Sequence, residues 1–100
     1  MSLEKIYNYI EANSEKTIKD LIRLVKQPSV SAKKEGLKEC AEIVEKMMKE
    51  LGLSTKVIPE KEGNPVVFGE IKGKKAKKTL LFYDHYDVQP PEPLEEWICD

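Results

Sequence analysis

The sequence predicts an α/β fold in which two helices pack on a mixed β-sheet. Apolar residues recur at helical spacing through the first half of the chain, which predicts the helices. Short β-branched and aromatic runs follow in the second half, which predicts three strands. One hundred residues with 40% apolar content suit one small domain with a modest core.

The first predicted element is a helix over residues 3–26, which is either continuous or bent near Asn13 and Ser14. Pro28 disfavours helix at the residue before it and therefore marks the end. We expect the apolar face to pack on the sheet rather than to bind a partner protein. Its members recur at helical spacing, and they are Ile6, Ile10, Ile18, Leu21, Ile22 and Val25.

The second predicted helix runs from Glu35 to Leu51 and is structural. Its apolar stripe consists of Leu37, Ala41, Val44, Met48 and Leu51. Gly52 follows the stripe and suits a left-handed C-terminal cap. Between the two helices, the loop Gln27–Ser31 contains Ser29 and Ser31. With no histidine nearby in sequence and no glycine elbow, neither serine has the setting of a nucleophile.

Three strands are expected after the second helix. The first is Ser54–Pro59 and the second is Pro65–Ile71, in which Gly69 marks a bulge or a close approach of another chain segment. The basic stretch Lys72–Lys78 is expected to be a solvated hairpin turn. The third strand is the apolar run Leu80–Tyr83, which is expected to be buried in the sheet.

The candidate site follows the third predicted strand. His85 is the only histidine, and it stands where that strand is expected to leave the sheet. Open α/β sheets bind ligands at the carboxyl ends of their strands. Asp87 lies two residues further on, so both side chains share a face if the chain stays extended. The imidazole can then bind a metal while the carboxylate orients it. The plainer interpretation is two polar residues at a strand end.

The segment Thr79–Trp97, TLLFYDHYDVQPPEPLEEW, resembles the histidine-containing segment of the co-catalytic zinc metallopeptidases. That family includes carnosinase-type dipeptidases, the carboxypeptidase related to glutamate carboxypeptidase, acetylornithine deacetylase, succinyl-diaminopimelate desuccinylase and aminoacylase. The resemblance implies that His85 is a zinc ligand and Asp87 its catalytic partner. Asp84 departs from the pattern, since relatives usually have glycine there. The Pro-Ser-x-Ser loop is also similar to the turn after the first helix of these peptidases.

The resemblance implies zinc-dependent hydrolysis of a peptide or amide bond in a small substrate, of the dipeptidase or carboxypeptidase type, with metal-bound water as nucleophile. Two zinc ions are expected in the complete site, with cobalt or manganese as alternatives. A tetrahedral zinc site needs four ligands, and the only histidine is already used. We therefore expect residues 1–100 to be the N-terminal part of a catalytic domain, inactive alone. The other ligands and the lid domain of a full-length homodimer would lie elsewhere.

Two alternatives remain open. The first is an N-acyl amino acid deacylase or desuccinylase of the same superfamily, which has the same chemistry and a different substrate. The second is an inactive fragment that acts as a non-catalytic module and binds no metal tightly. A panel of dipeptides and N-acyl amino acids distinguishes the dipeptidase from the deacylase.

Charge and composition restrict the partners. The formal net charge of −1 gives no support for nucleic acid or a membrane surface as a partner. No apolar run approaches the roughly 20 residues of a membrane span, and the N-terminus lacks the apolar core of a signal peptide. Cys40 and Cys99 are far apart and not in a paired motif, which favours reduced thiols and a cytoplasmic location.

Overall fold

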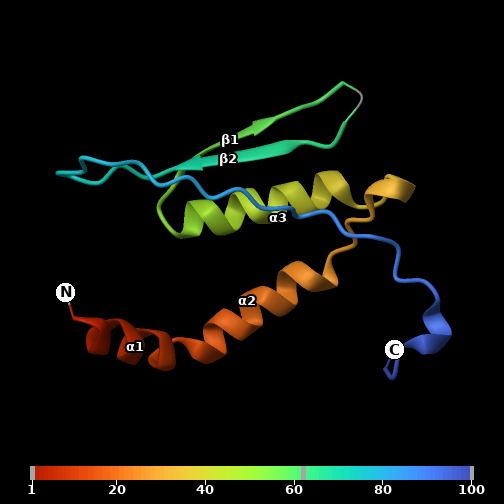
Figure 1. The fold of residues 1–100 in the computed structure, drawn as a ribbon. Helices are drawn as coiled ribbons and strands as arrows, with labels where there is room; N and C mark the ends of the chain where they lie inside the picture. The colour runs from red at the N-terminus through yellow and green to blue at the C-terminus, as the bar shows by residue number, and fades with distance from the viewer. Residues whose placement is uncertain (1, 62, 100) are drawn as a thin grey trace.

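The computed structural model describes residues 2–61 and 63–99, and their elements form an α/β arrangement (Figure 1). Helix α3 lies along one face of an antiparallel hairpin of β1 and β2, while α1 and α2 follow one another further from the sheet. In chain order the elements are α1 (Leu3–Ala12), α2 (Ser14–Lys26), the 3-10 turn η1 (Ser31–Lys33), α3 (Leu37–Glu50), β1 (Ser54–Ile58), β2 (Val66–Glu70) and the 3-10 turn η2 (Leu94–Glu96).

The bend predicted near Asn13 is present and separates α1 from α2. The Asn13 side-chain amide donates a hydrogen bond to the Tyr9 carbonyl oxygen at 2.8 Å, so it satisfies a carbonyl at the end of α1. Helix α2 contacts α3, and an ion pair between Arg23 and Glu50 joins them at 3.5 Å. The apolar residues of α2 remain largely exposed to solvent; Leu21, for example, is 60% exposed.

Glycine residues fix both ends of α3. At its C-terminus Gly52 has a φ of +87°, as predicted for a left-handed cap. The Leu53 N–H bonds to the Met48 carbonyl at 3.1 Å, and the Gly52 N–H bonds to the Lys49 carbonyl at 2.9 Å. This is the Schellman arrangement. At the N-terminus Gly36 has a φ of +69°, and a Cβ there would lie 2.0 Å from the Pro28 carbonyl oxygen.

The core lies between α3 and the loop before it. Leu37, Cys40 and Ala41 of the helix are buried, together with Ser29 and Val30 of the loop. Leu51, the last member of the predicted stripe, is instead exposed at the end of the helix. Burial of these few apolar side chains is the main favourable contribution to folding that this part of the chain offers.

The hairpin pairs Ser54 with Glu70 through Ile58 with Val66, without interruption. A Cβ on Gly69 would lie 2.8 Å from the Met48 sulfur and 2.9 Å from Leu53 Cδ2. Gly69 therefore marks the predicted close approach, here between β2 and α3, and no bulge. The basic turn Lys72–Lys78 is exposed, as expected of a solvated turn.

The third strand predicted at Leu80–Tyr83 does not form. In the described residues the sheet has two antiparallel strands, so it is not the mixed sheet of three that the sequence predicts. Leu80 to Tyr83 are 77–82% exposed. An apolar run becomes a buried strand only where neighbouring strands accept its backbone hydrogen bonds and a second layer covers it. The described residues provide neither at this segment.

Candidate metal centre

The loop between α2 and η1 holds the segment that carries His85 and Asp87. Val30 of the loop forms a parallel bridge with Val88, and the Val88 N–H donates to the Ser29 carbonyl oxygen at 2.9 Å. Figure 1 shows the C-terminal segment, in blue, crossing close to this loop. Two parts of the chain that are distant in sequence are thereby joined directly beside Asp87.

Tyr86 anchors the same segment toward the interior. Its hydroxyl donates a hydrogen bond to the Pro65 carbonyl oxygen, and its carbonyl oxygen accepts from the Cys40 sulfur at 3.9 Å. In extended backbone, successive side chains point to opposite sides. Anchoring Tyr86 inward therefore directs His85 and Asp87 to the other side of the segment, where the His85 side chain is 70% exposed.

The structure brings the two predicted site residues together. His85 Nδ1 lies 2.8 Å from Asp87 Oδ1, and the Asp87 side chain is only 27% exposed. The rings of Tyr83 and His85 also pack edge to face, with their centroids 5.8 Å apart and an interplanar angle of 72°. The imidazole is thus held on one side by a carboxylate and on another by a ring.

The electrostatics of the pair determine which imidazole nitrogen carries the proton. Hydrogen bonds from His85 and then from the Ser31 side chain lower the pKa of Asp87 below its ordinary value. Asp87 is therefore an ionised carboxylate near neutral pH, which only accepts hydrogen bonds. A neutral His85 must then donate from Nδ1, which leaves Nε2 with a free lone pair, the form in which imidazole binds a metal.

This chemistry fits one ligand position of a metal centre and not a complete one. Among the residues that the structure describes, no three histidine, cysteine, aspartate or glutamate side chains gather closely enough to hold a metal ion. His85 is thus a single candidate ligand with its orienting carboxylate. The pairing of the loop between α2 and η1 with Val88 was not predicted, although the loop itself was. Local sequence gives no signal for a contact between such distant segments.

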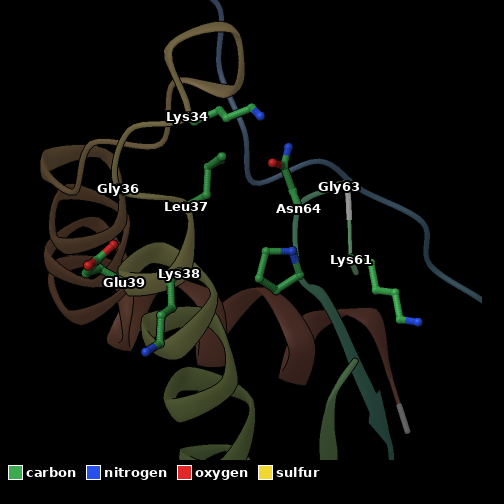
Figure 2. A pocket seen from close by; sticks show the side chains of 9 residues that line it. Lys34, Gly36, Leu37, Lys38, Glu39, Lys61, Gly63 and Asn64 are labelled. Carbon is green, nitrogen blue, oxygen red and sulfur yellow. The ribbon is translucent and has the colours of Figure 1, made fainter. Parts of the chain in front are cut away.

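A cleft of about 460 Å³ lies apart from this pair, between the start of α3 and the turn before β2 (Figure 2). Figure 2 shows that Lys38 and Lys61 point in different directions rather than toward a common centre. These two lysines therefore do not converge on one ligand. Its lining residues are Lys34, Gly36, Leu37, Lys38, Glu39, Lys61, Gly63, Asn64 and Pro65.

Trp97 is 61% exposed and so does not belong to the core. It lines a shallow hollow with the neighbouring prolines, and its indole N–H donates to the Pro91 carbonyl oxygen at 2.7 Å. Lys33 and Glu92 form an ion pair at 2.6 Å that ties the proline-rich segment to η1.

None of the described helices has the length and apolar character that a membrane-spanning segment requires.

Comparison with known proteins identifies relatives among the metallodipeptidases. The Cys-Gly metallodipeptidase dug1 of Schizosaccharomyces pombe is 31% identical over 112 residues, an alignment that covers all of this chain and 24% of the yeast protein. The Cys-Gly metallodipeptidase DUG1 of Candida albicans is 33% identical over 113 residues, which cover 97% of this chain and 23% of that protein. No family model and no solved structure matches the chain.

The His85 and Asp87 pair is compatible with one ligand position of a metal site, and both relatives are metallodipeptidases. The similarity to these Cys-Gly metallodipeptidases extends along nearly the whole of this chain. The chain spans about a quarter of the length of the relatives that it matches.

Proposed function

We propose that this chain supplies one metal ligand, His85, and its orienting carboxylate, Asp87, to the active site of a dipeptidase. The 2.8 Å contact between His85 Nδ1 and Asp87 Oδ1 carries the proposal, because it leaves Nε2 free to bind. The similarity to two metallodipeptidases supports the type of reaction. The remaining ligands and the general base belong to other parts of the complete active site.

The metal that we propose is zinc, which binds imidazole nitrogen readily. When bound, zinc supplies Lewis acidity for hydrolysis of a peptide bond. The residues of this chain have two tasks toward it. His85 presents Nε2 as a neutral donor, and Asp87 holds the ring in one tautomer and one orientation. Since Asp87 stays ionised, the pair also supplies a negative charge near the cation.

The proposal is tested by measuring the intact mass and the metal content of the naturally expressed polypeptide together. A mass well above 11.5 kDa with about two zinc ions per chain is the expected result. In that polypeptide, His85→Ala should remove bound metal and dipeptide hydrolysis together. A mass of 11.5 kDa without metal, or a His85→Ala variant with unchanged metal content, would contradict the proposal.

We further propose small dipeptides as the substrates, since the curated relatives are named for a dipeptide. The deacylase alternative predicts the reverse preference. The metal-loaded polypeptide should be assayed against Cys-Gly and other dipeptides, and in parallel against N-acetyl and N-succinyl amino acids. Faster turnover of the acyl amino acids would favour the deacylase.

We also propose that the complete enzyme is a homodimer and that it resides in the cytoplasm. The free thiols of Cys40 and Cys99 are consistent with a reducing compartment.

A further inference from the structure

We propose that Tyr86 is a positioning residue, which holds the segment of His85 and Asp87 in the geometry that pairs their side chains. This inference rests on the proposed function of that pair. It makes the position of the metal ligand depend on the start of β2, where the Tyr86 hydroxyl finds its hydrogen-bond acceptor.

The first step of the argument is the place at which the C-terminal segment becomes fixed. Residues 71–85, which follow β2, are all exposed. Tyr86 and Asp87 are the first residues after this stretch that are partly buried. The chain therefore returns to the body of the protein at Tyr86, and His85 stands directly before that point.

The second step concerns the two contacts that Tyr86 makes. Its hydroxyl donates a partly buried hydrogen bond to the carbonyl oxygen of Pro65, which comes directly before β2. The proline ring restricts φ at Pro65, so this acceptor has little freedom to move. The Tyr86 carbonyl oxygen accepts from the sulfur of Cys40, a residue of α3 that is 1% exposed, at 3.9 Å. Tyr86 is thus tied to the hairpin by its side chain and to α3 by its backbone.

The third step links this anchor to the pair. His85 and Asp87 flank Tyr86, and in extended backbone their side chains share the face opposite the tyrosine ring. The 2.8 Å contact between His85 Nδ1 and Asp87 Oδ1 fits that geometry. On the other side of Asp87, the Val88 N–H donates to the Ser29 carbonyl oxygen. Asp87 is therefore held between two anchors, whereas His85 has the Tyr86 anchor on one side and exposed chain on the other.

The test uses the metal-free 100-residue chain, because its single histidine gives unambiguous ring 15N signals. Ring 15N shifts, measured at a pH where the imidazole is neutral, report the ratio of the Nδ1–H to the Nε2–H tautomer. Tyr86→Phe keeps the partly buried ring and removes only the hydroxyl. It should lower the ratio roughly two- to tenfold, the factor that corresponds to the loss of one hydrogen bond.

Two controls separate the anchor from other effects. Tyr9→Phe removes the same atom from a tyrosine of α1 that is 70% exposed. Thr55→Val removes a hydroxyl that donates to Glu45 at 2.9 Å, and so loosens the contact of β1 with α3 without touching the segment. Both controls should leave the tautomer ratio unchanged. Asp87→Asn removes the direct acceptor and should change the ratio most.

Three outcomes decide between the explanations. If Tyr86→Phe leaves the ratio unchanged while Asp87→Asn alters it, the pair forms without the anchor and the positioning role is wrong, although the proposed function is untouched. An equal effect of Thr55→Val would also overturn the positioning role, because general loosening of the fold would then explain the result. Failure of the proposed function would instead appear in the metal content of the natural polypeptide, where His85→Ala would leave the bound metal unchanged.

Discussion

At the scale of single residues, the two cysteines occupy opposite environments. Cys40 is 1% exposed beneath the loop that supports the site, and burial raises the pKa of its thiol. Cys99 is exposed near the end of the chain. Because the thiolate is the reactive form, a disulfide reagent should modify Cys99 rapidly and Cys40 only when the core opens. A Cys99→Ser variant should therefore retain only the slow phase, and a fast phase in that variant would contradict the burial of Cys40.

Glu45 makes the stability of the molecule depend on pH. Its carboxylate pairs with Lys49 and accepts from the Thr55 hydroxyl, each at 2.9 Å, and these two contacts lower its pKa below 4.5. A lowered folded-state pKa stabilises the fold above the unfolded-state value and loses that effect as the pH falls. Glu45→Gln should therefore flatten the decline of the unfolding free energy below about pH 4.5, measured by denaturant titration at several pH values. The control is Glu42→Gln, which replaces an exposed carboxylate on the same helix and should not flatten the decline.

At the scale of elements, two glycines with positive φ serve different purposes. Gly52 has open space around its Cα, whereas a Cβ at Gly36 would meet the Pro28 backbone. Gly52→Ala should cost only the left-handed strain, roughly 1–2 kcal/mol of unfolding free energy. Gly36→Ala should cost more, because the loop before α3 must move as well. Equal losses for the two variants in urea denaturation would show that the close approach of Pro28 to Gly36 does not matter.

Elements whose cause is local could be predicted from the sequence. The helical stripe of α3, the cap at Gly52 and the proximity of His85 to Asp87 depend on residues a few positions apart. The strand at Leu80–Tyr83 could not be predicted correctly, because a strand exists only with partners that its own residues do not specify. The bridge between Val30 and Val88, which brings the loop beside the site, is equally non-local.

At the scale of the whole molecule, apolar surface is the dominant feature outside the site. The run Leu80–Tyr83 is almost fully exposed, and the outward face of the hairpin adds Val66 and Phe68, each about half exposed. Only four apolar residues are buried among those that the structure describes. Exposed apolar runs of this kind favour association.

The 100-residue chain should therefore self-associate in solution in a concentration-dependent manner. A double variant, Leu81→Lys with Phe82→Lys, should shift the mass measured by light scattering after gel filtration toward the monomer, because it places charge within the apolar run. A matched control, Asn8→Lys with Gln89→Lys, adds the same charge at exposed polar positions and should leave the association unchanged. If both double variants dissociate equally, net charge rather than the apolar run governs association. If the unsubstituted chain is monomeric at all accessible concentrations, the exposed run does not mediate self-contact.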